Sequence, residues 1–344
     1  MLRNAHHIAL LCALAASTAF GAKQVHDQDP LLLTISHGSA NFLAVVNTRT
    51  KEMNFVPTGG AGGVAVAGKL AAAVNFGSSN VTVFVRRGDG MEPTQVIKTI
   101  SQPVSVAFGH DHLVVLGLTT AESFPVYGET VAKDNDGVGQ LLRGDKSAAQ
   151  IVTFDGGAFY SEKSGGLAEL NLDTNARPGL SRPNRPALLP AAPNNDTPFG
   201  MAARAANVCV TIAHSNLQTL VVNGQITATA AGPTPFKDGS GNIIHAPCWN
   251  ALSGHFLYSA DSPGKQLYRY LVSDANIFFD KAGVAKLGGP PTDLDVHDGL
   301  LGVIDGGDGL TSNASLFAID GEGELTLLFA VKIAGPINSA AIIP

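Results

Sequence analysis

The sequence GPINSAAIIP, Gly335 to Pro344, reads as the first strand of a structural unit that the chain does not complete. A Gly-Pro turn leads into two small polar residues, Asn338 and Ser339, and then into an apolar run. No hairpin partner follows this strand in the sequence. We therefore expect it to pair with a strand from a distant part of the chain.

The same kind of start occurs seven times along the chain. Each copy has a Pro or a small residue, two variable residues and then an apolar strand. The copies are AGGVAV (from Ala61), PVSVAF (Pro103), AQIVTF (Ala149), PFGMAA (Pro198), PCWNAL (Pro247), PTDLDV (Pro291) and PINSAA (Pro336). The steps between them are 42, 46, 49, 49, 44 and 45 residues, which is the period of a four-stranded β-propeller blade.

Short β-branched or apolar runs fill the intervals between these starts, and no segment has the 3.6-residue apolar period of a helix. Six complete units run from Ala61 to Gly335, and the N-terminal part supplies three strands that lack a first strand. The sequence thus predicts an all-β fold, a seven-bladed β-propeller with four antiparallel strands per blade. Pairing of the C-terminal strand with the N-terminal blade closes the ring and leaves no strand edge open. A β-sandwich is the alternative, but it does not require seven evenly spaced starts.

Residues 1–21 have the pattern of a secretory signal peptide. Arg3 precedes an apolar run from Ile8 to Phe20, and small residues mark a cleavage site near Gly21. The run is too short and too rich in Ala for a good membrane span, so we expect no membrane partner. The prediction is a secreted, extracellular protein in which residues 22–344 form one propeller domain.

Composition narrows the class of protein further. The 344 residues are 45% hydrophobic and 15% charged, as in globular chains. The net charge of −6 and the lack of a basic stripe predict no nucleic-acid partner. We also expect the protein to be a monomer. After signal cleavage Cys209 and Cys248 remain, and they either form a disulfide or are two buried thiols. Sequons at Asn80, Asn195 and Asn313 are compatible with a glycoprotein.

Three stretches resemble blades of the lactonase-type seven-bladed propellers: TPFGMAA (Thr197–Ala203), APCWNALSGHFLYSAD (Ala246–Asp261) and PTDLDVHDG (Pro291–Gly299). That family includes 6-phosphogluconolactonase and the fungal 3-carboxymuconate-lactonising cyclases, and it has many secreted relatives. The resemblance implies a lactone hydrolase or a lactonising isomerase that needs no cofactor and acts on a small organic acid or lactone. The Pro-His-x-His motif of the phosphogluconolactonase-like members is absent from the comparable starts PVSV and AQIV.

Ligands of propellers normally bind over the central channel, on the face that carries the entries into the first strands and the turns between second and third strands. Asn75, Asp261 and Asp305 fall at such turns and are expected to cap them. Seven other residues of this face are the predicted substrate-binding set: His37, Gln150, His245, Trp249, Asn250, Asp293 and Asn338. Trp249, the only tryptophan, is either a stacking platform for a ligand or core packing between blades.

Glu162 and His214 are the predicted catalytic pair. Both fall at turns of neighbouring blades, although Glu and His are poor turn formers. Together they could act as general base and general acid in lactone hydrolysis or in cyclisation. The alternative is a solvated ion pair or hydrogen bond at the rim, and a non-catalytic propeller that binds a ligand or protein on this face is the alternative function.

Other motifs do not point to a metal or a cofactor. The stretch KDNDG, Lys133 to Gly137, lacks the first ligand and the distal Glu of a calcium loop, and no zinc-type cluster is present. Residues 119–147 and 233–245 are longer than their counterparts in other units. They are expected to be either lids over the mouth or ordinary loop variation.

Overall fold

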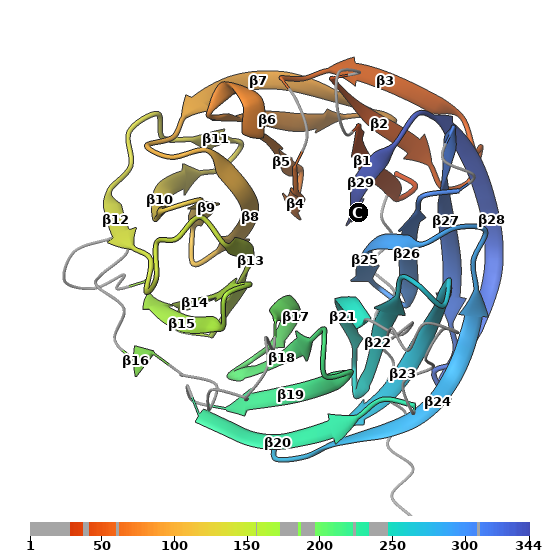
Figure 1. Cartoon of the computed structure of the whole chain (residues 1–344). Helices are drawn as coiled ribbons and strands as arrows, with labels where there is room; N and C mark the ends of the chain where they lie inside the picture. Colours follow the sequence, from red (N-terminus) through yellow and green to blue (C-terminus); the bar gives the residue numbers. More distant parts are fainter. Residues whose placement is uncertain are drawn as a thin grey trace, which may run out of the picture.

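The computed structural model describes residues 28–36, 41–59, 62–155, 157–172, 185–186, 197–222, 225–233, 247–307 and 310–344. These residues form seven small antiparallel sheets around a central opening (Figure 1). The predicted all-β, seven-bladed propeller is confirmed. Within the described ranges there is no α-helix, only a short 3-10 turn at Phe76–Ser78, and no helix long and apolar enough to cross a membrane.

The strands of blades 1 to 4, from the channel outward, have the following bounds. Blade 1 contains β29 (Ile337–Ile343), β1 (Leu31–Ser36), β2 (Phe42–Asn47) and β3 (Met53–Pro57). Blade 2 contains β4 (Val64–Ala67), β5 (Leu70–Asn75), β6 (Asn80–Arg87) and β7 (Gly90–Lys98). Blade 3 contains β8 (Pro103–Gly109), β9 (His112–Gly117), β10 (Thr120–Tyr127), β11 (Thr130–Val131) and β12 (Gly137–Gln140). Blade 4 contains β13 (Ala148–Phe154), β14 (Gly157–Glu162), β15 (Gly166–Asn171) and β16 (Arg185–Pro186).

The last three blades follow the same order. Blade 5 contains β17 (Pro198–Arg204), β18 (Asn207–Ile212), β19 (Leu217–Val222) and β20 (Gln225–Ala231). Blade 6 contains β21 (Pro247–Ser253), β22 (Phe256–Asp261), β23 (Gln266–Val272) and β24 (Ile277–Lys286). Blade 7 contains β25 (Pro291–His297), β26 (Leu300–Asp305), β27 (Thr311–Ile319) and β28 (Leu325–Ala334).

The C-terminal strand β29 closes the ring, as predicted. It pairs antiparallel with β1, from Leu31 opposite Ile343 to Ser36 opposite Ile337. A buried arginine of blade 2, Arg86, holds the same seam, because its guanidinium donates to the backbone carbonyls of Asp29, Ile343 and Pro344. The seam thus combines a paired strand edge with a cation that binds the end of β29 and the segment just before β1.

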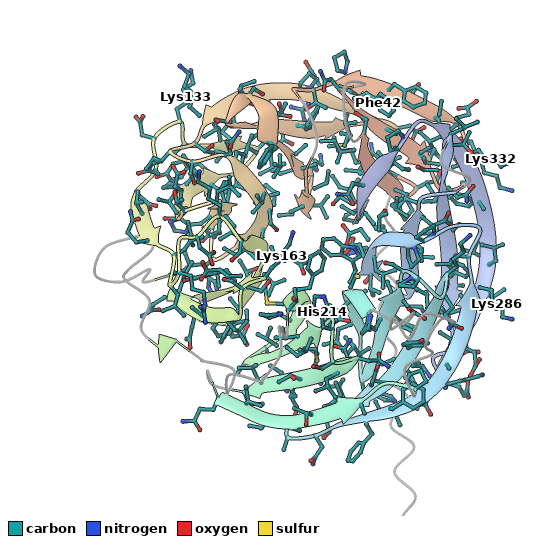
Figure 2. All side chains as sticks on the ribbon, in the orientation of Figure 1. Phe42, Lys133, Lys163, His214, Lys286 and Lys332 are labelled. Carbon is teal, nitrogen blue, oxygen red and sulfur yellow. The ribbon has the colours of Figure 1, made fainter. Side chains whose placement is uncertain are left out.

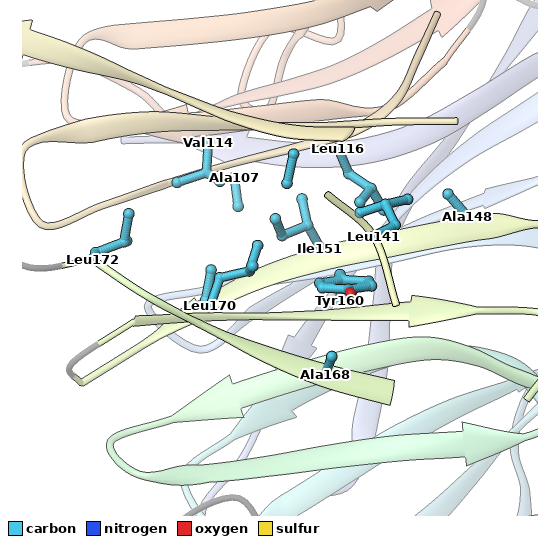
Figure 3. Close-up of a cluster of buried hydrophobic side chains, with 12 residues drawn as sticks. Ala107, Val114, Leu116, Leu141, Ala148, Ile151, Tyr160, Ala168, Leu170 and Leu172 are labelled. Carbon is cyan, nitrogen blue, oxygen red and sulfur yellow. The ribbon is translucent and has the colours of Figure 1, made fainter. Parts of the chain in front are cut away.

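The second strands explain why the chain is so rich in unbroken apolar runs. β5, β9, β14, β18 and β22 are buried at every position. Each blade is covered by a neighbour on both of its faces, so these strands cannot alternate between apolar and polar residues. One such inter-blade core lies between blades 3 and 4, where Ile151, Tyr160 and Leu170 pack against Val114 and Leu116 (Figure 3).

The long segment of blade 3, residues 119–147, extends the outer side of that blade (Figure 1). β12 and β11 both pair with β10, the first with Thr120–Ser123 and the second with Val126 and Tyr127. The outermost strand is therefore built from two short pieces, and these strands belong to the sheet rather than forming a lid. Residues 234–246, most of the second predicted insertion, lie outside the described residues.

Candidate functional site at the mouth of the channel

The first strands begin with a β-bulge. The pairing of the first and second strands shifts register directly after the opening residue in β8, β13, β17, β21 and β25. A bulge re-aims a side chain, and here the re-aimed residue is the third of the strand. In four blades it accepts a backbone N–H from the first strand of the next blade, and these four residues are Ser105, Gln150, Asp293 and Ser339.

Gly200 occupies this third position in blade 5. A Cβ there would lie 2.0 Å from the carbonyl oxygen of Cys248, because the first strand of blade 6 approaches so closely. Blade 5 therefore uses the missing side chain to bring the two backbones together. The third residues of these five blades thus lie at the contacts between neighbouring first strands, and Ser105, Gln150, Asp293 and Ser339 also line the mouth cavity.

Two cavities lie along this channel. The mouth cavity, of about 90 Å³, is formed where the first strands begin, and Gln150, Trp249, Asp293 and Asn338 line it. The channel cavity, of about 290 Å³, is bounded by the first strands themselves and includes Asn250 and Asp295. Gln150 and Asp293 line both cavities, so the two follow one another along the channel. Four of the predicted binding residues thus line one mouth, and their role in binding stays a prediction.

Asp293 and Asp295 are the only ionisable side chains among the described residues that line these cavities. The Asp293 Oδ2 accepts from the N–H of Ala340 at 2.9 Å, and the Asp295 Oδ2 accepts from the N–H of Ile342 at 2.6 Å. Enclosure by the ring raises the pKa of Asp293 to about 6. Enclosure, aided by the neighbouring Asp293 carboxyl, raises the pKa of Asp295 to about 7.

A basic and aromatic group lies beside the mouth cavity on blades 4 to 6. Lys163 places its Nζ 5.1 Å from the centre of the Phe199 ring. Phe199 meets Trp249 edge to face, with ring centres 4.8 Å apart. His214, which is exposed, has its Nδ1 2.8 Å from the Thr197 hydroxyl. Figure 2 shows Lys163 and His214 close to the central opening, whereas Lys133, Lys286 and Lys332 lie on the outer side of the ring.

Glu162 does not line either cavity, although a catalytic acid or base has to reach the ligand. Its side chain is fully buried at the end of β14, and its carboxylate accepts from the backbone N–H groups of Arg143 and Gly144. Burial raises the pKa of Glu162, although these two donors oppose the shift. The carboxylate therefore holds the linker that leads into blade 4.

The same position at the end of the second strand is polar in other blades. Asn75 accepts from the Thr58 hydroxyl and from the N–H of Gly59, in the linker that leads into blade 2. Asp305 accepts from the N–H of Gly307, which confirms its predicted role as a turn cap. Glu162 thus belongs to a set of buried acceptors that fix linkers and turns.

The predicted pair of Glu162 and His214 is not brought together around either cavity, since neither residue lines the mouth or the channel. Their catalytic roles stay a prediction. Asn250 is buried in the channel wall and donates its amide to Gln218 Oε1 at 2.8 Å. His37 and His245 lie outside the described residues.

Sequence reasoning missed Asp295, Lys163 and Phe199. Asp295 follows Asp293 by two positions, and residues i and i+2 of a strand share a face, so this signal was present. Lys163 directly follows Glu162, but only the fold shows that the lysine faces the mouth while the glutamate is buried. Within the described ranges, no three His, Cys, Asp or Glu side chains converge as ligands for a metal ion.

The structure also bears on the two cysteines and on two of the three sequons. Cys209 and Cys248 are not disulfide-bonded. Burial raises the pKa of Cys209 to about 12, so this thiol is inert as a nucleophile. The amides of Asn80 and Asn313 are both engaged, with Ser78 O and with Asp305 Oδ1 respectively. A glycan on either residue would replace that bond. The third sequon, at Asn195, lies outside the described residues.

The chain matches no protein-family model and no curated protein sequence. Similar solved structures do exist. A Bacteroides fragilis protein, provisionally assigned as a 6-phosphogluconolactonase, is 13% identical, with a TM-score of 0.67 over 93% of this chain and 99% of its own. A Bacteroides uniformis protein with the same provisional assignment is also 13% identical, with a TM-score of 0.69 over 92% of this chain and 100% of its own.

A protein of unknown function from Desulfotomaculum acetoxidans is similar to the same degree. It is 10% identical, with a TM-score of 0.69 over 91% of this chain and 98% of its own. These likenesses establish the fold. The three proteins share the arrangement of the ring with this chain over nearly their whole length, and at such low identity the activity has to be argued from the site itself.

Proposed function

We propose that this protein is a secreted, cofactor-free enzyme that binds a small organic acid or its lactone at the mouth of the channel and opens or closes the lactone ring. The observation that carries the proposal is the mouth itself. One cavity is lined by the polar residues Gln150 and Asn338, by the carboxyl of Asp293 and by Trp249, with Lys163 and His214 beside it.

Asp293 is the group that we assign to proton transfer. Its pKa of about 6 lets it be ionised at neutral pH yet basic enough to accept a proton. Its two oxygens accept the backbone N–H groups of Leu294 and Ala340, and the Ser339 hydroxyl is a third hydrogen-bond partner. A carboxylate has about four acceptor positions, which leaves about one for water. Asp293 lies on the shared wall of both cavities, where a water molecule and a ligand can meet.

The proposed hydrolysis balances without a further reactant. The oxygen of water bonds to the lactone carbonyl carbon, and the ring C–O bond breaks. Asp293 takes a proton from the attacking water and delivers it to the leaving alkoxide oxygen. The product is a hydroxy acid, and Lys163 and His214 are the groups available to stabilise its carboxylate.

The names of the two Bacteroides proteins support this reaction class, since both carry a provisional lactonase assignment. The stretches quoted above also resemble the lactonase-type family. Export forms part of the proposal and depends on residues 1–21. N-terminal sequencing of the protein from the culture medium should begin near residue 22, and protein retained in the cell with Met1 intact would contradict export.

The test of activity is a panel of five- and six-membered lactones, with hydrolysis followed by acid release between pH 5 and 8. We expect turnover of at least one lactone, with kcat/KM rising through an apparent pKa near 6, and loss of turnover in Asp293→Asn. The exposed Glu52→Gln variant is the control and should behave as the unaltered protein. Turnover that survives Asp293→Asn would overturn the assigned role.

A second function, ligand binding without catalysis, is favoured by one observation. Asp293 already accepts two backbone N–H groups, from Leu294 and Ala340, as a purely structural carboxylate would. Binding of lactones or organic acids with no hydrolysis across the whole panel would support this function over the enzyme.

A further inference from the structure

We propose that Lys163, Phe199, Trp249 and His214, here called the aromatic rim, form a subsite that orients ligands by their charge. The ligand class is a flat organic anion with its negative charge at one end only. Its carboxylate would lie at the rim and its uncharged end would point into the channel. This inference deepens the proposed function, because it concerns the same mouth.

The charge of the aromatic rim is available to a ligand. Among the residues that the structure describes, neither Lys163 nor His214 forms an ion pair with a carboxylate. The Lys163 ammonium is held over the face of Phe199, which attracts the cation but does not neutralise it. His214 is tied through Nδ1 to Thr197, so its exposed Nε2 side is the one open to a ligand.

The aromatic part of the rim supplies a flat surface next to that charge. Phe199 and Trp249 are each half-buried and hold one another in an edge-to-face contact, with an interplanar angle of 68°. Trp249 also lines the mouth cavity and packs against the core between blades 6 and 7. Aromatic side chains fixed in this way give contact area to a planar ligand at little entropic cost.

The interior of the channel has the opposite charge. Asp293 and Asp295 line it, and no Lys, Arg or His is among the described lining residues. A second anionic group that entered the channel would meet these carboxylates in an enclosed space, where repulsion is stronger than in water. A ligand with one anionic end therefore has one favoured orientation, and a ligand with anions at both ends has none.

The chain's only tryptophan lies in the aromatic rim, so intrinsic fluorescence reports binding there directly. The ligands to compare are benzoate, its neutral isostere benzamide, the non-planar cyclohexanecarboxylate, and terephthalate with a carboxylate at each end. We expect benzoate to bind tighter than each of the other three by about threefold or more, the range of one exposed charge or stacking contact. Calorimetry on the same protein repeats each titration.

The decisive variant is Lys163→Met, with Lys133→Met as its matched control on the outer side of blade 3. Lys163→Met should weaken the binding of benzoate by about threefold and leave the affinity for benzamide unchanged. Lys133→Met should change neither affinity. Equal affinity of the unaltered protein for benzoate and benzamide would overturn the proposal, as would no binding of benzoate at about 10 mM by either method.

These measurements distinguish failure of the proposed subsite from failure of the proposed lactonase activity. Binding is measured without turnover, and Asp293→Asn should retain the preference for benzoate over benzamide, which depends on Lys163 and not on Asp293. If no lactone is hydrolysed but the Lys163 dependence holds, the enzyme proposal fails and the subsite stands. If lactones are hydrolysed but Lys163→Met binds benzoate as well as the unaltered protein does, the subsite fails and the enzyme stands.

Discussion

Two sets of polar side chains lie on the same face of the ring and have different environments. The first set ends the second strands, and its members, Asn75, Glu162 and Asp305, are buried and bonded to linkers or turns. The second set lies at the entries of the first strands, and its members, Gln150 and Asp293, line the channel while they bond the next blade.

The position of a polar residue along its strand therefore decides its role near the propeller mouth. At the end of a second strand, the neighbouring blades cover both faces, so a carboxylate there is hydrogen-bonded within the protein, to backbone N–H groups as Glu162 is or to side chains as Asp261 is, and has no access to a ligand. At the entry of a first strand, the bulge turns the residue toward an open cavity.

The largest effect should come from removal of a complete entry strand. A chain that ends at Gly335 lacks β29, so β1 loses its partner and the apolar side chains of Ile342 and Ile343 are lost from the core. We expect Tm to fall by more than about 10 °C, or the protein not to fold. Melting followed by circular dichroism measures this. A Tm equal to that of the full chain would show that β29 does not close the ring.

The next effect concerns the second-strand set. Glu162→Ala removes the acceptor for the N–H groups of Arg143 and Gly144 and should cost about 1–3 kcal/mol. Urea unfolding measures the loss, and Glu52→Ala, at an exposed position, is the control and should stay within about 0.5 kcal/mol. A loss of unfolding free energy in Glu162→Ala no greater than in the control would show that Glu162 has no structural role.

Two carboxyls that line the channel, Asp293 of the entry set and Asp295 farther along the same strand, should instead govern how stability depends on pH. The folded pKa values of Asp293 and Asp295, about 6 and about 7, lie above the value near 3.9 of an unfolded Asp. The folded state thus favours the protonated carboxyls, and their contribution to stability is present below about pH 4 and is lost as pH rises to 7. Glu122 and Glu162 change in the same direction, because burial raises the pKa of each.

Replacement of both aspartates isolates this contribution. In Asp293→Asn/Asp295→Asn, Tm should fall less between pH 4.5 and 7.5 than in the unaltered protein, where we expect a fall of a few degrees. Calorimetric melts at both pH values measure the difference. Identical pH slopes in the two proteins would show that the enclosed carboxyls do not titrate as described.

The repeat made the architecture predictable because every blade uses the same kind of start, and β29 had no other partner within its own unit. The entries at Gln150, Trp249, Asp293 and Asn338 followed from the same alignment. The role of Glu162 did not follow, because it depends on the path of the linker at Arg143 and Gly144, which no local pattern encodes. The pairing of Lys163 with Phe199 likewise arises only when two blades pack together.

The two sets of polar side chains have separate roles, and a paired measurement of stability and activity tests this separation. Tm and kcat/KM, on the lactone that the unaltered protein hydrolyses best, are compared for Glu162→Gln and Asp293→Asn. We predict that Glu162→Gln lowers Tm and keeps kcat/KM within about twofold, while Asp293→Asn keeps its Tm at pH 5 and loses turnover by about 100-fold or more. Loss of turnover in Glu162→Gln at an unchanged Tm, together with full activity in Asp293→Asn, would contradict it.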